Sequence, residues 1–589
     1  MTSNPARAAA VCALLATTWL ASPASADLVP PKSYLTTPGG INVADGSLTY
    51  SVTDLAIGPL TLERFHRTGR RQPNDPDFGT NFSHNFDIYV AANPVNLGTD
   101  NRPIAHLGGS ASGVYSQVKA TLSSIAPANG DAERGYLEWS GGTNFSTGNY
   151  VYTDSSGTIY TFSRTVSAAG VPFYSQRVSE IVFPDGRKQN FVYVGGRLRR
   201  VEDSSGYALV LEYNGAGDIN AACAFDRART YVDGSTSCAG AALRTSYGYD
   251  SNGRLNSAVD AAGQATAYTN SADGITCITP PGFSSCQMSM ALSNGRMGTQ
   301  TLADGGTWSV YGDDPARLND PDETPPQHGD NAVRVVDPAG VYVDLTFTKT
   351  SPYTMTDANG HVTEFRYTGG KLFHDTSNSA DSHGTMLLEA ILPEGQRYLA
   401  EYNGPYRGVT RERMLARPGS GLPDQERTLA YCGVPATRQN CARPAWIRDT
   451  AGNQTDFTYN ARGQQLSEMQ PAPTAGAARP LKLNTYVERY AYMLNAIGQL
   501  VPGPAPISIP ATETLCQTVA GSSTPACDPA APQTVTTVEY GPDGTANNLR
   551  PRGQVVSSGG QSRRTCFGYD ATGNRISETA PRAGLTSCP

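Results

Sequence analysis

Hydrophobic and polar side chains alternate over short stretches along most of the chain, and many of these stretches end in a tyrosine. In the stretch that ends at Tyr213, Leu209 and Leu211 share one face with the tyrosine, whereas Val210 and Glu212 lie on the other. A period of two residues is typical of a β-strand. The same alternation occurs in Val362–Tyr367 and Gln454–Tyr459. No helical periodicity of useful length is present in residues 27–470.

A recurring turn motif separates these stretches, and its clearest copy is YDSNGRL, Tyr249–Leu255. The carboxylate of Asp250 can accept main-chain N–H bonds at the start of a type I turn, and Gly253 can adopt a positive φ without a Cβ clash. The motif therefore predicts a hairpin turn. Its other copies contain Tyr213 and Gly217, Tyr459 and Gly463, and Tyr569, Asp570 and Gly573.

A second turn signal, D-x-x-G, alternates with the first. It occurs at Asp203, Asp260, Asp357 and Asp449. The resulting unit of about 20 residues holds two strands and two turns. A unit of this size cannot bury an apolar face alone, so the units must pair side by side. The sequence therefore predicts an all-β fold in which hairpins form one long winding sheet.

The repeated units resemble the YD repeats of the Rhs (rearrangement hotspot) family, because turn, tyrosine and period recur together. The segments Ile41–Thr68 and Phe78–Val90 are also similar to the region that opens many Rhs proteins. The resemblance implies a β-strand spiral that wraps into a hollow shell, or partial cocoon. In that family, which is also seen in bacterial toxin complexes and teneurins, the shell often encloses a C-terminal toxin.

Five regions are expected along the chain. These are a signal peptide (1–26), an N-terminal Rhs-type β-region (27–150), a YD/Rhs repeat array (151–470), a Pro/Ala-rich insertion with a local disulfide (471–535) and further Rhs repeats (536–589). Family members usually carry a core with a D-P-x-G motif after the repeats, and then a toxin. The DPAG sequence at Asp337–Gly340 lies within the array and is interpreted as an ordinary repeat turn. The expectation is a truncated or split member, or a scaffold without attached cargo.

The first residues have the pattern of a secretory signal. Arg7 precedes the apolar run Ala8–Ala21, and the small residues Ala24–Ala26 follow it. The run is too short to span a bilayer as a stable helix. We therefore expect export by a Sec-type route and a soluble mature protein in the periplasm, at the cell surface or outside the cell.

Ten of the 11 cysteines follow this leader, and they occur as sequence neighbours. No C-x-x-C motif is present, which disfavours a zinc site. In an oxidising compartment the cysteines are expected to form five local disulfides, although sequence alone does not fix the pairing. The neighbouring candidates are Cys223 and Cys238, Cys277 and Cys286, Cys432 and Cys441, Cys516 and Cys527, and Cys566 and Cys588.

Charge and motif content point away from nucleic-acid binding and catalysis. The chain has 45 Lys and Arg against 52 Asp and Glu, a net charge of −7, and no basic patch. Its seven histidines form no H-E-x-x-H motif, and G-x-S-x-G and P-loop sequences are absent. We expect no catalytic residues, cofactor or metal. The acidic loop Gly312–Pro326 is interpreted as solvated, with Ca²⁺ as the alternative, and His84 as a hydrogen-bonding residue of a tight loop.

The leading hypothesis is an exported, non-catalytic scaffold that forms all or part of a β-shell around a partner or toxin cargo. An unpaired edge strand would invite a companion polypeptide or self-association. One alternative is an extracellular carbohydrate-binding or cell-surface binding protein, in which tyrosines stack on sugars instead of packing across strands. Another is the N-terminal fragment of a polymorphic toxin whose effector domain is missing.

Overall fold

The computed structural model describes most of the chain, with gaps. The described residues are 37–42, 47–67, 77–79, 82–92, 104–107, 112–118, 121–127, 136–140, 149–154, 156–163, 174–293, 296–312, 332–348, 351–367, 387–402, 408–433, 436–441, 443–570 and 575–588. The predicted signal peptide, Gly573 and all but the first residue of the acidic loop lie outside them.

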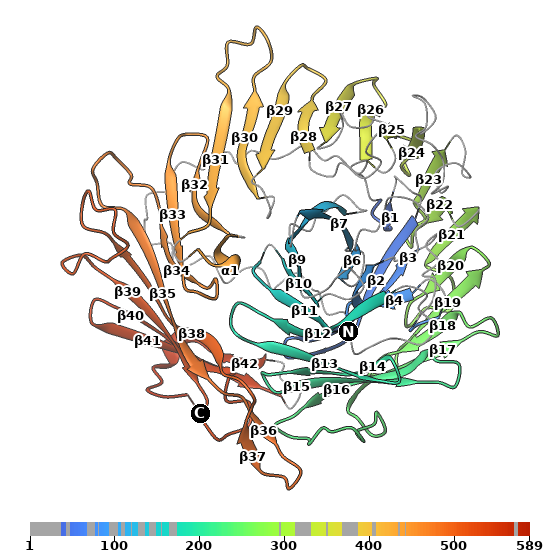
Figure 1. Ribbon diagram of the computed structural model, residues 1–589, viewed down its shortest axis with the longest axis horizontal. Helices are drawn as coiled ribbons and strands as arrows, with labels where there is room; N and C mark the ends of the chain where they lie inside the picture. The colour runs from blue at the N-terminus through green and yellow to red at the C-terminus, as the bar shows by residue number, and fades with distance from the viewer. Residues whose placement is uncertain are drawn as a thin grey trace.

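One large antiparallel sheet makes up most of the molecule, and its strands are neighbours in the order in which they follow along the chain. Figure 1 shows that this sheet curves round until its last strands lie beside its early ones. The predicted all-β class and winding hairpin array are confirmed. Consecutive strands pair antiparallel, and many of the connections are short hairpin turns with their own turn residues.

The first part of the large sheet follows the repeat array. Its strands are β12 (Tyr174–Val182), β13 (Lys188–Val194), β14 (Arg197–Asp203), β15 (Tyr207–Tyr213), β16 (Ile219–Asp226), β17 (Leu243–Tyr249), β18 (Leu255–Val259), β19 (Ala265–Ser271), β20 (Gly274–Thr279), β21 (Met288–Ser293), β22 (Arg296–Thr301), β23 (Thr307–Gly312), β24 (Ala332–Val336), β25 (Tyr342–Thr348), β26 (Ser351–Asp357) and β27 (Val362–Tyr367).

The second part continues the same order to the last strand. Its strands are β28 (Leu387–Ile391), β29 (Arg397–Tyr402), β30 (Val409–Leu415), β31 (Gln425–Tyr431), β32 (Pro444–Arg448), β33 (Gln454–Tyr459), β34 (Gln465–Met469), β35 (Pro480–Arg489), β38 (Ile507–Gln517), β39 (Thr534–Tyr540), β40 (Pro551–Ser558), β41 (Gln561–Tyr569) and β42 (Arg575–Thr579). A short helix α1 (Arg438–Cys441) and a 3₁₀ turn η4 (Pro581–Ala583) accompany them.

The expectation of an insertion at 471–535 is wrong in part. Two long strands of the large sheet, β35 and β38, lie in this segment and pair with each other over almost their whole length. Alternation of apolar and polar residues in PLKLNTYVER and ISIPATETLCQ outweighs the prolines, which fall at a strand start and at the register shift opposite Tyr486. The hairpin of β36 (Tyr492–Leu494) and β37 (Leu500–Pro502) stands apart as a two-stranded sheet, and residues 518–533 form a loop that the Cys516–Cys527 disulfide fastens.

A second, smaller sheet lies against the large one. It consists of β1 (Ile41–Asn42), β2 (Ser47–Ile57), β3 (Leu60–Arg67) and β4 (Phe82–His84), paired in that order. It contacts β15, β16, β17 and β22, and Figure 1 shows it inside the curve of the large sheet. Leu48, Leu60 and Leu62 are fully buried in the core that the two sheets share. We call this element the inner sheet.

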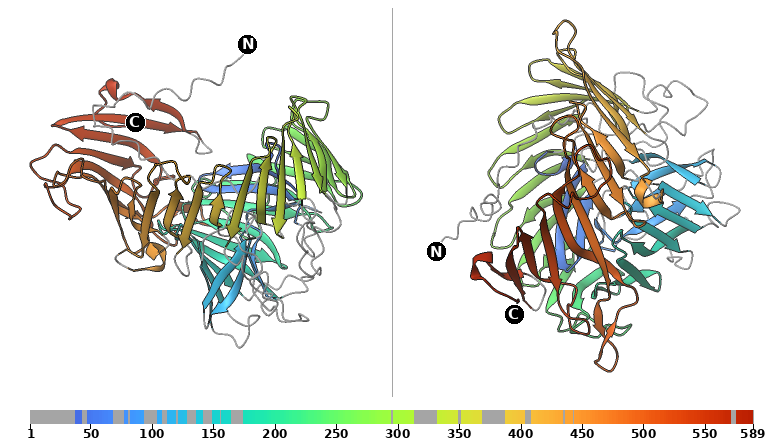
Figure 2. Two further views of the ribbon diagram at one scale, coloured as in Figure 1. Left: turned by 90° about the horizontal axis from the view of Figure 1, so that it is seen from above. Right: turned by 90° about the vertical axis from the view of Figure 1, so that its left-hand side faces the viewer.

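The remaining N-terminal strands form a ring of pairings. They are β5 (Ile88–Ala92), β6 (Ile104–Leu107), β7 (Ser112–Val118), β8 (Thr121–Pro127), β9 (Tyr136–Ser140), β10 (Asn149–Thr153) and β11 (Ile159–Ser163). Each pairs with the next, β11 pairs with β12, and the first residues of β12 pair back onto β5. In both views of Figure 2 these cyan strands extend beyond one rim of the large sheet.

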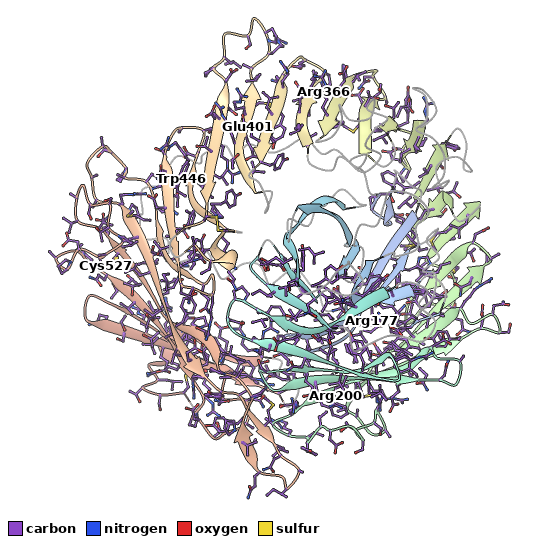
Figure 3. All side chains as sticks on the ribbon, viewed as in Figure 1. Arg177, Arg200, Arg366, Glu401, Trp446 and Cys527 are labelled. Atoms are coloured by element: carbon purple, nitrogen blue, oxygen red, sulfur yellow. A yellow bond between two sulfur atoms is a disulfide. The ribbon has the colours of Figure 1, made fainter. Side chains whose placement is uncertain are left out.

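The ten cysteines form five disulfides between sequence neighbours. The bonds join Cys223 to Cys238, Cys277 to Cys286, Cys432 to Cys441, Cys516 to Cys527 and Cys566 to Cys588. The first of these is fully buried and fastens a loop over the outer face of β15 and β16, where it packs with Val210 and Val232. Arg200, on the outer side of the sheet in Figure 3, donates to the main-chain oxygen of Asp233 in that loop (2.7 Å). Both faces of these strands are therefore buried.

Candidate functional site

The repeat turn has the chemistry that its residues predict. Asp250 Oδ1 accepts the main-chain N–H groups of Asn252 and Arg254 at 2.8 and 3.0 Å. Gly253 has φ +72°, a conformation that most other residues adopt only with strain. Gly217 and Gly463 also have positive φ, in copies where an asparagine side chain replaces the aspartate. These residues are spread along the sheet and do not converge on one site.

The repeat tyrosines connect one hairpin to the next. The Tyr213 hydroxyl donates to the main-chain oxygen of Leu198 at 2.8 Å, and Leu198 is paired with Tyr193 across the preceding hairpin. Tyr249 donates in the same way to Ile219 at 2.6 Å, and Ile219 is paired with Tyr213. The hydroxyl of each of these tyrosines therefore binds one residue of the preceding hairpin. That residue is the one paired with the tyrosine of the preceding unit. We call this series of bonds the tyrosine relay.

The relay extends through both halves of the large sheet. In one unit Asn270 takes the place of tyrosine, and its side-chain amide donates to Leu255, the partner of Tyr249. Further members are Tyr402 to Leu387, Tyr459 to Pro444, Tyr486 to Gln465, Tyr540 to Pro510 and Tyr569 to Pro551. Each of these acceptors is paired with the tyrosine of the previous hairpin. Sequence reasoning identified Tyr213, Tyr249, Tyr459 and Tyr569 but none of the acceptors.

A register shift explains why such acceptors exist. The shift occurs immediately before the tyrosine in each of these hairpins, for example between Gly248 and Tyr249. A bulge of this kind disrupts the local ladder and increases the twist of the strand pair. The relay places a hydroxyl donor at that disrupted position. Burial also raises the pKa of Tyr459 and Tyr540 to about 12, which keeps both phenols neutral.

A buried ion pair between β2 and β3 of the inner sheet binds two tyrosines of the large sheet. The Arg64 guanidinium donates through Nε and Nη2 to the two carboxylate oxygens of Asp54 at 2.9 and 3.0 Å, and Nη2 also donates to the Tyr268 hydroxyl. Tyr247 donates to Asp54 at 2.8 Å. Burial opposes the charge on Arg64, but Asp54 more than offsets this and raises the pKa of the guanidinium. His66 nearby is fully buried, which lowers its pKa to about 3 and leaves it neutral.

Two further buried pairs involve the N-terminal strands. His84 Nδ1 accepts the main-chain N–H of Phe86 at 3.2 Å, so its Nε2 carries the proton that binds Asp77 at 2.9 Å. This is the local loop bonding that the sequence indicated for His84. Arg177, on the inner side of the sheet in Figure 3, binds Asp87. These ionisable groups hold strands together.

Two distant parts of the large sheet come into contact where residues 185–228 meet residues 491–569, a contact that we call the seam. Arg550 donates through Nε and Nη2 to the Tyr207 hydroxyl at 3.0 and 2.8 Å. Asn547 Nδ2 donates to Asp226 at 2.9 Å, across 321 residues of sequence. Main-chain bonds add to these side-chain contacts, since the Ser508 amide donates to the oxygen of Asp185 at 2.7 Å.

A cavity of about 340 Å³ opens at the seam. Its charged lining residues are Asp185, Arg187 and Arg550, and the rings of Tyr207, Tyr492 and Tyr569 also line it. No sequence motif marked this place, because its walls come from segments hundreds of residues apart. Among the described residues no group of three or more metal-ligating side chains is found, and no helix is long and apolar enough to cross a membrane.

Comparisons with known proteins give distant structural similarities. No protein-family model and no curated protein matches the chain. The TcdB2–TccC3 crystal structure is 10% identical with a TM-score of 0.31, over 82% of this chain and 25% of that one. A Photorhabdus luminescens Tc holotoxin pore is 10% identical with a TM-score of 0.32, over 93% and 30% of the two chains. The N-terminal domain of the effector SpvB from Salmonella typhimurium is 15% identical with a TM-score of 0.19, over 63% and 99%. The chain spans about a quarter of the length of the first of these matches.

Proposed function

We propose that the chain is an exported, non-catalytic scaffold that forms part of a β-shell around a partner polypeptide. The observation that carries this proposal is the tyrosine relay, which joins successive hairpins in two stretches of one curved sheet, from Leu198 to Asn270 and from Leu387 to Tyr569. The buried ionisable groups support the non-catalytic role, because Arg64, His84 and Arg177 each bind a carboxylate that fastens strands together. Export is supported by the five disulfides, which persist in oxidising compartments. A toxin as the enclosed partner follows from the sequence resemblance alone.

The wall has an edge that suits a further hairpin of the same design. Among the described residues, β42 pairs only with β41. Arg575 in β42 is paired with Tyr569, the position whose main-chain oxygen accepts a hydroxyl in earlier units. No tyrosine of the described residues donates to Arg575. An unpaired edge exposes backbone N–H and C=O groups that another strand can bind. The partner we propose is therefore a polypeptide that adds a hairpin with its own relay tyrosine.

Sugar binding by the repeat tyrosines has less support. The hydroxyls of Tyr213, Tyr249 and Tyr459 donate to main-chain oxygens within the sheet, so they are already engaged. The rings of Tyr213 and Tyr249 also pack against the buried core, and burial raises the pKa of the Tyr249 phenol. A role in joining hairpins accounts for both observations.

Site-specific photocrosslinking tests the edge. A photoreactive amino acid at Ile576 in β42, which is 68% exposed, should give adducts with a partner in the cells that make the protein. The matched control is Leu422, which is 69% exposed in the turn between β30 and β31. Mass spectrometry of the adduct would identify a companion chain or a second copy. If Ile576 gives no more adduct than Leu422, the edge is not a joining surface and the proposal fails.

A further inference from the structure

The seam cavity has the size of a small-molecule site and is built by well-separated segments. It is lined by the β2–β3 turn at Gly58–Pro59, the turns at Asp185–Arg187 and Ser205–Tyr207, strand β38, and the loop Asn547–Pro551. Its volume of about 340 Å³ lies in the range of small-ligand pockets. Both sides of the seam therefore contribute to one cavity, which is open to solvent on one side.

The charges around the cavity balance. Arg187 Nη1 donates to Asp203 at 2.7 Å, and Arg550 lies 3.8 Å from the carboxylate of Asp226. Asp185 adds a carboxylate 3.8 Å from Arg187 Nε. No strong excess of either sign is left to attract an anion or a cation. The electrostatics therefore favour a neutral ligand.

The cavity lining keeps both hydrogen-bond donors and hydrogen-bond acceptors that a ligand can use. A guanidinium carries five N–H donors. Arg187 uses Nη1 on Asp203, and Arg550 uses Nε and Nη2 on Tyr207, so each keeps N–H groups without a partner among the described residues. The Asp185 side chain is 38% exposed, and its Oδ2 has no hydrogen bond there. A guanidinium offers two neighbouring donors and a carboxylate offers two neighbouring acceptors. Each of these planar groups can therefore bind two adjacent hydroxyls on a ligand ring.

Aromatic and aliphatic surfaces complete the lining. Tyr207, Tyr492 and Tyr569 contribute rings, and Ile507 and Ile509 contribute aliphatic side chains. Tyr207 and Tyr569 are held in place by Arg550, whose guanidinium lies 5.7 and 5.8 Å from their ring centres. Tyrosine rings give apolar faces with a polar end, which suits a ligand that has C–H faces and a rim of hydroxyls.

We propose that the seam cavity binds a neutral sugar of one or two rings. Arg187, Arg550 and Asp185 bind its hydroxyls, and the tyrosine rings contact its C–H faces. Because the ligand touches both sides of the seam, it binds the closed wall and stabilises it by mass action. Tyr569 is a repeat tyrosine that lines this site, but the other walls come from residues outside the repeat motif, and the inference goes beyond the scaffold role.

Ligand-observed NMR and thermal unfolding of the whole protein test the proposal. The probes are glucose, galactose, N-acetylglucosamine, maltose, lactose and chitobiose, each at millimolar concentration. At least one should show saturation transfer from the protein and should raise the melting temperature. Asp185→Asn should weaken its binding by about tenfold, since one charged hydrogen bond is lost. Ile509→Trp should abolish binding by filling the cavity.

A matched control distinguishes the loss of a ligand contact from the effect of altering a turn. Asp304 Oδ1 accepts the N–H two residues on at 2.8 Å, as Asp185 Oδ1 does at 2.9 Å, but Asp304 lies in an exposed turn away from the seam. Asp304→Asn should leave sugar binding unchanged. The proposal is overturned if none of the six sugars binds. It is also overturned if Asp185→Asn and Ile509→Trp bind a sugar as tightly as the unchanged protein does.

Discussion

The hydroxyl of Tyr249 donates a hydrogen bond of 2.6 Å to the main-chain oxygen of Ile219, which lies 30 residues earlier in the chain. Ile219 is itself paired with Tyr213, the tyrosine of the preceding unit. A residue that marks a turn in the sequence therefore joins two hairpins in the structure. This explains why the repeat uses tyrosine where phenylalanine would supply the same ring but no donor.

Replacement of Tyr249 by phenylalanine should weaken the sheet locally. The change removes the hydroxyl and leaves the oxygen of Ile219 without that donor, so we expect a loss of about 1–2 kcal/mol. Hydrogen exchange of the β16–β18 amides would measure it. Tyr311→Phe is the control, because Tyr311 is 57% exposed and has no role in the relay. Equal loss of protection in the two variants would argue against the relay.

Replacement of Arg64 by methionine should release the inner sheet. Asp54 would remain buried without its cation, and breaking a buried pair in this way costs about 3–5 kcal/mol. The expected result is a large fall in melting temperature and rapid proteolysis within β1–β4. Arg334→Met is the control, because Arg334 binds Asp344 through two bonds but is 49% exposed. A similar effect of both variants would show that the Arg64 pair has no special role.

Stability should fall in alkaline solution above pH about 10. Burial raises the pKa of Tyr459 and Tyr540 to about 12 in the folded chain, against about 10 when unfolded. The neutral phenol is therefore favoured by folding, and this stability is complete below pH 10 and lost as pH rises towards 12. Melting temperature measured against pH would show the decline. The double variant Tyr459→Phe and Tyr540→Phe should decline less steeply, and an unchanged slope would contradict the assignment.

Replacement of Arg550 by methionine should open the seam. Two donors to the Tyr207 hydroxyl and the contact with Asp226 disappear, while the strands on either side keep their own pairing. We expect faster hydrogen exchange in the β14–β15 turn and in residues 541–551, with little change in β20–β25. Arg575→Met is the control, since Arg575 is 53% exposed in β42. Unchanged exchange in the β14–β15 turn would show that Arg550 does not hold the seam.

Local sequence was enough to predict the hairpin but not the strand content of residues 471–535. Asp250 and Gly253 act within a few residues of each other, so their turn chemistry can be read directly. Prolines and alanines in 471–535 indicated an insertion, yet β35 and β38 form there because alternating side chains pack on both neighbours. Tertiary pairing outweighed composition, which is a weak guide to strands.

The candidate site depended on contacts that no local pattern encodes. Arg550 and Tyr207 are 343 residues apart, and neither belongs to a motif that distinguishes it from other arginines and tyrosines. Their meeting requires the twist of every intervening hairpin to add up to a closed curve. Small differences in twist per unit would place β40 away from β15, so the seam could not be predicted from repeat spacing.

The sequence by itself determined the all-β class, the unit of about 20 residues and the turn that ends each strand, because these depend on interactions within one hairpin. Only the tertiary structure decided that distant strands of the sheet meet at a seam, that the Arg64–Asp54 pair of the inner sheet binds Tyr268 and Tyr247 of the large sheet, and that repeat tyrosines such as Tyr249 bond to the preceding hairpin. These features depend on curvature accumulated over many units, and curvature is a property of the packed strands together.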